Sequence, residues 1–429
     1  MKYLLLRSKD KPMKKLEIIG AVLLVAGVLA YRPNTMRGAN GSHAPIVIAN
    51  DSDFTVCNCM TSGSGTTTDP YIIGPWVINS ASGNAAVVID GALLTKSFTL
   101  SNLMIAGDGT SSSAGIVLNH INPSGQNTIS AAVSGTNTSI QHTGIGIVVE
   151  NSNFVTLDGG GANPNGPGIV TTNTAGTINK NFVGAIDIEN SSNITVKGWQ
   201  FSANGQDNSP DYIAFDPSLA NWGVGAVRLF ASNNNLIDHN AANNCTTASF
   251  TVLDSSHNTI SNNTADYPFT NNVLITDGSS FNSVMNNVFG TADFVGILVA
   301  DPLPGTMTLN QFGPSHDNLI QGNVDHSDGG TGTERHSGIA PAFDGGIVIL
   351  NGTYNNNIKD NQVSASAGAD LVWAQEVIDP STPIGIAAEP PFIHCNVTVS
   401  EGGVGVVNQN GNVWSGNTFK KIDPCITQH

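Results

Sequence analysis

The chain has 429 residues, of which 47 are Gly and 50 are Asn, whereas charged residues make up only 11%. Soluble domains average about 25% charged residues, so a helical surface built on Lys and Glu, or a coiled coil, is disfavoured. A hydrophobic content of 40% is too high for a disordered chain. The net charge is −16, and because nucleic-acid binding needs clustered basic side chains, a nucleic-acid partner is disfavoured as well.

The N-terminal segment has the layout of a secretory signal. Basic residues, including Lys14 and Lys15, precede an apolar run over residues 18–30, which is shorter than the about 20 residues of a membrane-spanning helix. Residues 1–30 are therefore predicted to be a signal peptide, with an uncleaved N-terminal anchor as the alternative and as the only membrane contact. Residues 31–75 are predicted to form a leader and cap. We expect the protein to be secreted, periplasmic or on the cell surface.

A short motif recurs along the second half of the chain: Asn, any residue, an aliphatic residue, two of any type, and Asn. The aliphatic positions Ile237, Ile260 and Val284 are separated by 23 and 24 residues, the length of one solenoid coil with three short strands. Between the motifs lie shorter runs with alternating apolar residues, as at 184–188, 225–229, 250–252 and 403–406. The pattern predicts stacked parallel strands whose apolar faces are buried only against neighbouring coils.

Asn at equal positions in successive coils suits the bends of such a stack. The side-chain amide both donates and accepts hydrogen bonds, so Asn240, Asn263 and Asn287 are predicted to form a ladder that satisfies backbone groups at a corner. These asparagines are interpreted as structural and not as catalytic residues.

The repeats from about Leu100 to Phe419, and the opening segment from Gly63 to Ile73, resemble those of right-handed parallel β-helix repeat proteins of the pectate-lyase-like superfamily, including NosD-like proteins. The resemblance implies an all-β fold, a single-stranded right-handed parallel β-helix of about ten coils over residues 76–420. Insertions are expected near 199–224, 324–346 and 374–394, followed by a C-terminal tail over 421–429. The superfamily includes lyases, hydrolases, epimerases and adhesins, so the resemblance leaves the activity open.

Five cysteines leave at least one without a partner inside the chain. Cys395 and Cys425 flank the last repeat and are a candidate disulfide that would stabilise the C-terminal end. Cys57 and Cys59 are interpreted as a local disulfide or as free thiols, since no second Cys or His pair stands beside them at metal-ligand spacing.

The resemblance directs attention to a groove along one strand face. Asp187 lies nine residues before Val196, and Arg228 nine before Ile237, which places both on adjacent coils, facing outward, about 4.8 Å apart. They are candidate catalytic residues, because an Arg beside a carboxylate can bind a uronate or help to abstract a proton. The alternative is an ordinary exposed cross-strand ion pair, worth only about 0.2–1 kcal/mol.

Aromatic and acidic residues crowd the predicted insertion between these two coils. Trp199, Tyr212, Asp216 and Trp222 are candidate substrate-binding residues, since flat rings pack on sugar faces and carboxylates accept hydroxyl hydrogens. The alternative is that these rings form the insertion's own small core.

The next insertion holds the densest group of titratable residues in the exported part of the chain. His and carboxylate side chains together can act as acid and base or bind a divalent cation, whereas a glycine-rich loop of mixed charge is usually only solvated. The members of this second candidate patch are His326, Asp328, Glu334, Arg335, His336 and Asp344.

These observations favour an exported β-helix that binds an extracellular polysaccharide or cell-surface glycan. Whether it is also an enzyme is left open; if it is, a polysaccharide lyase or a glycoside hydrolase is expected. The alternatives are a non-catalytic surface scaffold or adhesive repeat protein, and a NosD-like periplasmic metal-accessory protein. No cofactor is required by the sequence and no metal site can be assigned, although Ca²⁺ is compatible with the acidic loops.

Overall fold

The computed structural model describes residues 41–80, 83–108, 113–161, 175–205, 224–245, 248–268, 271–292, 295–300, 313–326, 345–350, 352–364, 369–375, 393–394 and 411–420. All of them belong to one unit, Gly38–His429. The predicted signal segment and the predicted tail lie outside the described residues. No helix among the residues just given is long and apolar enough to cross a membrane.

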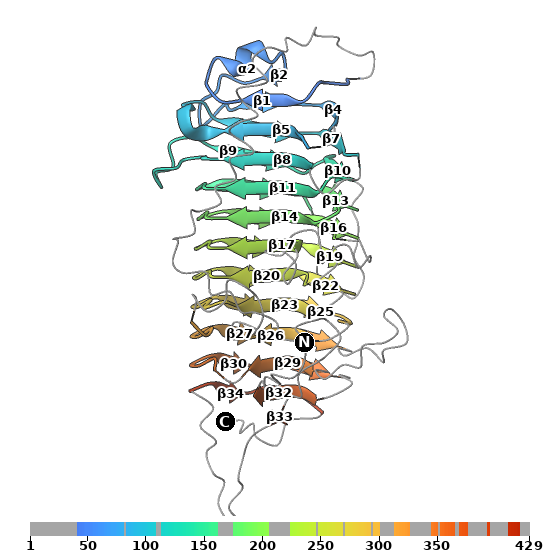
Figure 1. The fold of residues 1–429 in the computed structure, drawn as a ribbon, viewed down its shortest axis with the longest axis vertical. Coiled ribbons are helices and arrows are strands. Elements are labelled where there is room, and N and C mark those ends of the chain that lie inside the picture. Colours follow the sequence, from blue (N-terminus) through green and yellow to red (C-terminus); the bar gives the residue numbers. More distant parts are fainter. Residues whose placement is uncertain are drawn as a thin grey trace, which may run out of the picture. The chain divides into compact units, whose positions relative to one another are not determined.

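The chain runs through three sheets in turn and then steps to the next coil, so the strands of each sheet stack along one axis (Figure 1). Sheet 1 contains β1 (Ile46–Ile48), β5 (Ala85–Asp90), β8 (Ala114–Asn119), β11 (Ile145–Glu150), β14 (Gly184–Glu189), β17 (Gly225–Phe230), β20 (Phe250–Leu253), β23 (Asn271–Thr276), β26 (Val295–Val299), β29 (Gly345–Leu350), β32 (Ala369–Gln375) and β33 (Ile393–His394).

Sheet 2 contains β2 (Met60–Ser62), β3 (Tyr71–Ile73), β6 (Phe98–Ser101), β9 (Ala131–Ser134), β12 (Val155–Asp158), β15 (Thr195–Lys197), β18 (Leu236–Asp238), β21 (Thr259–Ser261), β24 (Ser283–Met285), β27 (Leu319–Gln321), β30 (Asn357–Lys359) and β34 (Val413–Ser415). Sheet 3 contains β4 (Trp76–Asn79), β7 (Leu103–Ala106), β10 (Ser139–Gln141), β13 (Thr177–Asn179), β16 (Gln200–Ser202), β19 (Ala241–Asn243), β22 (Thr264–Asp266), β25 (Val288–Phe289), β28 (Val324–His326) and β31 (Gln362–Ser364).

Neighbouring strands pair in parallel, except β2 with β3 and β32 with β33, which pair antiparallel at the two ends of the stack. The predicted parallel β-helix is confirmed, and sheets of 12, 10 and 12 strands agree with the expected about ten coils. Three of the predicted alternating runs correspond to β14, β17 and β20, whereas the run at 403–406 lies outside the described residues.

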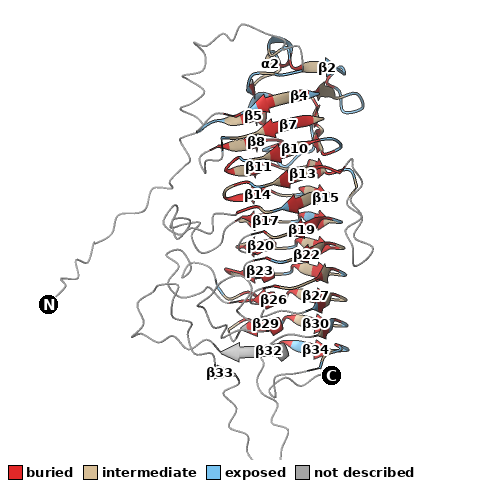
Figure 2. Ribbon diagram, turned by 90° about the vertical axis from the view of Figure 1, so that its right-hand side faces the viewer, coloured by how far each residue is buried: buried red, intermediate tan, exposed pale blue. Residues whose placement is uncertain are grey.

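The core is a set of aliphatic columns that run along the axis inside the three sheets. The repeat centres Val196, Ile237 and Ile260 occupy the same register in sheet 2 and are at most 2% exposed. Ile186 and Val227 do the same in sheet 1. Buried residues recur along the stacked strands in Figure 2. Each coil therefore buries its apolar side chains against the coils before and after it.

Two asparagine ladders support the corners on either side of sheet 2. The backbone N–H and the side-chain Nδ2 of Asn240 both donate to Oδ1 of Asn263, at 2.9 and 3.0 Å, and Nδ2 also donates to the carbonyl of Val196. The predicted ladder is thus confirmed, and it continues beyond the three residues that the sequence indicated. Its members are Asn240, Asn263, Asn287, Asn323, Asn361 and Asn417, and those of the other ladder are Asn235, Asn258, Asn282, Asn318, Asn356 and Asn412.

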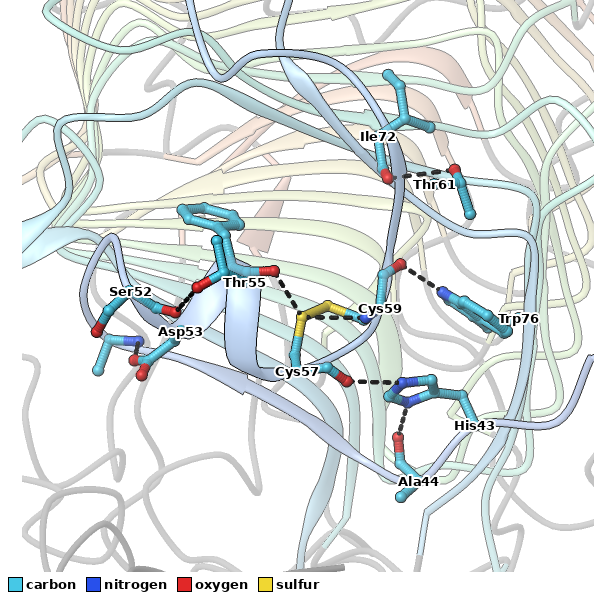
Figure 3. Close-up of a disulfide and its surroundings, with 12 residues drawn as sticks. His43, Ala44, Ser52, Asp53, Thr55, Cys57, Cys59, Thr61, Ile72 and Trp76 are labelled. Carbon is cyan, nitrogen blue, oxygen red and sulfur yellow. Dashed lines mark hydrogen bonds between the residues drawn. A yellow bond between two sulfur atoms is a disulfide. The ribbon is translucent and has the colours of Figure 1, made fainter. Parts of the chain in front are cut away.

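A short cap closes the N-terminal end of the described stack. Helix α2 (Asp53–Val56) buries Phe54 against the rings of Tyr71 and Phe98, and a disulfide joins Cys57 to Cys59 directly after it (Figure 3). Of the two states considered for this pair, the local disulfide is therefore the one observed. A further single turn of 3₁₀ helix, η1 (Gly91–Leu93), follows β5.

The remaining cysteines separate into two groups. Cys245 is a buried free thiol, and burial raises its pKa to about 11, so it behaves as a small apolar side chain. The predicted partners Cys395 and Cys425 lie outside the described residues.

The stack starts earlier than the sequence indicated. Strands β1 and β3 already pair in parallel with β5 and β6, so the first stacked strands lie inside residues 31–75. Strands β16, β28 and β32 reach into the three predicted insertions. Most of the other residues of those insertions lie outside the described part of the chain.

Candidate functional site

The side chains on the outward face of sheet 1 change from apolar to charged between the first coils and the middle of the stack. Alternate side chains of a strand point to opposite faces of the sheet, and two outward rows follow from the strand register. The first row reads Val88, Val117, Val148, Asp187, Arg228, Thr251 and Leu274; the second reads Asp90, Asn119, Glu150, Glu189, Phe230, Leu253 and Thr276. Valine thus gives way to a charged cluster on β14 and β17.

Asp187 and Arg228 lie directly opposite each other in the ladder, as the equal spacing predicted. Arg228 donates through Nε to Asp187 Oδ1 at 2.8 Å and through Nη2 to Asp187 Oδ2 at 2.6 Å. The same Nη2 donates to Glu189 Oε1 at 2.6 Å. A fixed guanidinium fork that matches a carboxylate in this way is the strongest kind of side-chain ion pair, and here it also orients a second carboxyl.

The expectation that this pair is exposed is wrong. The side chains of Asp187 and Arg228 are each 5% exposed, whereas that of Glu189 is 20% exposed. Burial of an ion pair removes the hydration of both charges, and the attraction between the two charges must offset this cost in free energy. The ion pair of Asp187 and Arg228 is therefore buried, and Glu189 is the residue of the cluster that remains partly accessible to solvent.

Burial and crowding of like charges shift the carboxyl groups of this face. The pKa of Glu189 is raised to about 7, first by burial and then by the negative charge of Asp187, while Arg228 partly opposes the shift. Burial also raises the pKa of Glu150, one coil before Glu189. A carboxyl that still holds its proton near neutral pH can serve as a general acid. The spacing of residues in the sequence did not identify Glu189 as a candidate.

A second carboxylate pair lies at the ends of the next two strands of sheet 1. Asp254 directly follows β20 and Asp277 directly follows β23, which pair in register. Asp277 is 4% exposed, and its Oδ1 has no hydrogen-bond partner among the described residues. Burial, reinforced by the charge of Asp254, raises the pKa of Asp277 to about 6, and burial raises that of Asp254. The sequence pattern that could have identified these two residues is an Asp six or seven residues before the aliphatic centre of a repeat.

Trp199 does not fit the role predicted for it. Its side chain is fully buried in the core, and its backbone N–H donates to Asn240 Oδ1 at 3.0 Å. It therefore offers no face to a sugar, and the prediction of substrate contact is wrong. The physical reason is that the coil continues through β16, so Trp199 precedes an ordinary strand and the insertion begins later.

The other predicted binding residues are described only in part. Tyr212, Asp216 and Trp222 lie outside the described residues. His326, from the second patch, is exposed at the end of β28, where its Nδ1 lies 2.7 Å from the hydroxyl oxygen of Ser364. The rest of that patch, Asp328, Glu334, Arg335, His336 and Asp344, lies outside the described residues.

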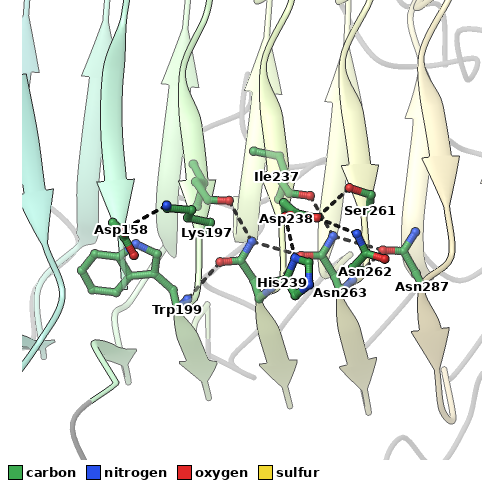
Figure 4. A network of polar contacts seen from close by, with 12 residues as sticks. Asp158, Lys197, Trp199, Ile237, Asp238, His239, Ser261, Asn262, Asn263 and Asn287 are labelled. Atoms are coloured by element: carbon green, nitrogen blue, oxygen red, sulfur yellow. Dashed lines mark hydrogen bonds and ion pairs between the residues drawn. The ribbon is translucent and has the colours of Figure 1, made fainter. Parts of the chain in front are cut away.

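The outward face of sheet 2 carries a different polar network (Figure 4). Asp238 lies 2.5 Å from Nδ1 of His239 and accepts hydrogen bonds from the Ser261 hydroxyl and from Nδ2 of Asn262. These contacts hold the pKa of Asp238 below its usual range, despite partial burial. Because Ser261 donates to the carboxylate and not to the imidazole, the three residues do not form a nucleophilic triad.

An aromatic row follows the turn between sheets 1 and 2. The rings of His257 and Phe281 stack with centroids 5.1 Å apart, and those of His316 and Tyr354 stack at 4.6 Å. These rings pack on one another from coil to coil, and Phe281 nevertheless remains 50% exposed. Among the described residues, no group of three or more His, Cys, Asp or Glu is placed to hold a metal ion.

Comparison with known proteins gives a family model and several solved structures. Residues 105–312 match the model of the right-handed β-helix region, and no curated protein matches the sequence. An alginate lyase from Paenibacillus sp. shares 12% identity, with 90% of this chain and 97% of that chain covered and a TM-score of 0.39.

Two further structures have similarly low likeness. A DFA-IIIase from Arthrobacter chlorophenolicus shares 11% identity, with 94% of this chain and 90% of that chain covered and a TM-score of 0.43. The Dettilon tailspike protein shares 12% identity with a TM-score of 0.44; the match covers 77% of this chain but only 57% of the tailspike chain.

Proposed function

Because this chain is a right-handed parallel β-helix protein, we propose that it binds a carbohydrate at Glu189 and Phe230, two partly exposed residues on the outward face of sheet 1, and cleaves it by acid–base chemistry. The observation that carries the proposal is the cluster of Asp187, Glu189 and Arg228 on two adjacent strands. It is the place on the described strands where a regular apolar row is replaced by interacting charges.

Glu189 has the two properties that a proton donor needs. Its carboxyl is partly exposed and is held in one orientation by Nη2 of Arg228. Its pKa of about 7 keeps a large fraction protonated near neutral pH, where a general acid works best. Asp187 is fixed by the same guanidinium and acts as the electrostatic partner that keeps the proton on Glu189.

Phe230 gives this face a surface for a sugar ring. It follows Glu189 in the same outward row, is half-buried, and its ring centroid lies 6.0 Å from the guanidinium carbon of Arg228. Aromatic side chains bury the apolar faces of sugar rings well.

The test is a binding and degradation screen with the full chain against neutral and uronate polysaccharides. Binding is read by calorimetry, and cleavage by new reducing ends or unsaturated products. We expect Glu189→Gln to retain binding and to lose at least 100-fold in cleavage rate, the low end of what a general acid contributes. Asp158→Asn is the matched control, since Asp158 forms an exposed ion pair with Lys197 on sheet 2.

Silence across the whole panel would overturn the proposal and favour the rival function, a non-catalytic surface scaffold or adhesive protein. Tight copper binding by the purified chain, measured in a metal titration, would instead favour the metal-accessory role.

We also propose that the protein is exported, because an apolar run over residues 18–30 follows basic residues. Mass spectrometry of the protein recovered outside a secreting host is expected to give an N-terminus near residue 31. Full-length protein retained in the cytoplasm would contradict export.

A further inference from the structure

The aromatic row between sheets 1 and 2 places one ring in each of four successive coils. Its members, in the turns from β20 to β21, β23 to β24, β26 to β27 and β29 to β30, are His257, Phe281, His316 and Tyr354. Backbone bridges join His316 to Ser280 in the coil before it and to Tyr354 in the coil after it, so these turns are in register. Neighbouring coils are about 4.8 Å apart, and the rings therefore form a single file along the axis of the stack.

The stack itself does not require a ring at Phe281. This residue directly precedes a member of an asparagine ladder and has a left-handed backbone, with a φ of 56°. The same place in two other coils is occupied by Asn234 and Asn355, with φ of 58° and 57°. Asn adopts this conformation readily, whereas a bulky side chain there is an outlier that strains the backbone. Strain of this kind concentrates at functional sites, so a ligand explains the ring better than the fold does.

The rings hold one another in place and still leave surface to solvent. His257 stacks on Phe281, whereas Phe281 meets His316 edge-on, with centroids 5.8 Å apart and an interplanar angle of 85°. An edge-on contact covers less of a ring than a stacked one, and both His257 and Phe281 are exposed. Nδ1 of His316 lies 2.7 Å from Oδ2 of Asp317, which fixes that imidazole. Because the rings are positioned before a ligand arrives, little conformational entropy is lost on binding.

Hydrogen-bonding groups accompany the apolar ring surface along the row. The imidazoles of His257 and His316 and the phenol of Tyr354 can donate or accept hydrogen bonds. Exposed amides lie at both ends, on Asn234 in the coil before His257 and on Asn355 directly after Tyr354. A sugar ring has apolar faces and a rim of hydroxyl groups, which such a strip complements. A protein partner usually covers about 800 Å², which is far more than a strip one ring wide offers.

The charge of these turns favours an uncharged glycan. As far as the structure describes the turns, no Lys or Arg lies in them, over residues 254–258, 277–282, 313–318 and 352–356. They contain acidic residues instead, namely Asp254, Asp277 and Asp317. The carboxylates of a polyuronate would therefore be repelled, without a Lys or Arg to pair with.

We propose that the aromatic row is a further carbohydrate-binding site, which holds a neutral linear glycan along the axis of the stack. The exposed parts of His257 and Phe281 pack against sugar rings, and the imidazole and phenol groups of the row form hydrogen bonds with hydroxyl groups. The site shares the ligand class of the proposed function but neither of its residues, Glu189 and Phe230. It therefore goes beyond that function, and the two sites can be tested separately.

The experiment measures binding of neutral hexasaccharides of glucose, xylose or mannose by calorimetry. The full chain carries Phe230→Ala, so that the sheet 1 site contributes little. Adding Phe281→Asn is expected to weaken binding of the preferred hexasaccharide about tenfold, because a ring contact is lost. The same substitution is expected to keep or raise the denaturation midpoint, because Asn suits a left-handed backbone better than Phe does.

Two further measurements locate the ligand on the row. Tyr267→Asn is the matched control and is expected to leave binding unchanged, since Tyr267 is also aromatic, 38% exposed and left-handed, with a φ of 56°, but follows β22 of sheet 3. In NMR titrations, the hexasaccharide is expected to shift the imidazole signals of His257 and His316. Those of His239, an exposed residue next to sheet 2, should stay in place. A row that only packs the coils would show no such shifts.

Normal binding by Phe281→Asn with a lowered denaturation midpoint would overturn this inference, because it is the result expected of a purely structural ring. Equal losses for Tyr267→Asn, preference for a galacturonate hexasaccharide, or absence of any binding by Phe230→Ala would overturn it as well. If binding depends on Phe281 but not on Phe230 or Glu189, the proposed sheet 1 site fails and this one stands. Absence of binding to every glycan would remove both.

Discussion

The two outward faces that flank the first corner of each coil behave in opposite ways. Sheet 2 carries small polar side chains and partly exposed ion pairs such as Lys197 with Asp158, and regular asparagine ladders border it. Sheet 1 carries Asp187 and Arg228, which are nearly inaccessible. Residues that recur at the same place in every coil, such as the asparagines, have a structural role. Buried charges that interrupt such a row, as on sheet 1, are not required for stacking the coils.

The largest expected effect comes from the buried ion pair of sheet 1. Arg228→Ala leaves Asp187 and Glu189 buried without their counter-charge, which costs about 3–5 kcal/mol in the free energy of unfolding. Chemical denaturation followed by circular dichroism measures this. Lys197→Ala, which removes the exposed pair of sheet 2, is the control and should cost less than about 1 kcal/mol. Equal losses in the two variants would contradict the contrast between the faces.

Next in size is a break in an asparagine ladder. Asn263→Ala removes the acceptor of two Asn240 donors and the donor to the Ile237 carbonyl. Buried groups left without partners cost about 1–3 kcal/mol each, and partial compensation by water limits the loss to about 2–3 kcal/mol. Asn262→Gly is the matched control, because it keeps a left-handed backbone and removes only an outer contact to Asp238. A loss below about 1 kcal/mol for Asn263→Ala would show that the ladder is dispensable.

Stability should also depend on pH through Glu189. Because the folded-state pKa is about 7, above the ordinary 4.5, the native state binds more protons than the unfolded state between these values. The contribution of this group is therefore most favourable below pH 4.5 and declines as pH rises to 7. Glu189→Gln is expected to flatten this part of the curve of denaturation midpoint against pH. An unchanged slope would mean that Glu189 is ionised normally.

The smallest effect is expected for Trp199, which lies inside the stack. Trp199→Phe keeps an aromatic ring in the core, and the Trp199 Nε1 that it removes has no hydrogen-bond partner among the described residues. We expect a loss of about 1 kcal/mol in stability and no change in glycan affinity. A tenfold drop in affinity, measured by calorimetry, would restore the substrate contact that its burial argues against.

The sequence predicted those parts of the fold that depend on repetition. Ile237, Ile260 and Val284 share a core column because every coil must bury an aliphatic side chain at that place, and the same spacing placed Asp187 opposite Arg228. It could not predict burial of that pair, because the accessibility of an outward row depends on packing outside the strands. Trp199 was misassigned because the strand that follows it, β16, has only three residues and a weak pattern.

Glu189 and Asp254 were missed for a related reason. Glu189 and Asp254 end or follow strands in a chain rich in polar turn residues, so composition does not distinguish them from ordinary corner residues. Their significance comes from neighbours in other coils, Arg228 and Asp277, which are 39 and 23 residues away in sequence. Only the register of the stack brings these groups together.

The most direct test of a carbohydrate site on sheet 1 is the affinity for a bound glycan after one side chain on each face is truncated. Phe230→Ala alters sheet 1, and Leu236→Ala alters a partly exposed position on sheet 2. If the carbohydrate site lies on sheet 1, Phe230→Ala is expected to bind about tenfold more weakly, because a ring contact is lost, and Leu236→Ala is expected to change the affinity by less than about twofold. Weaker binding of Leu236→Ala with normal binding of Phe230→Ala would contradict a carbohydrate site on sheet 1.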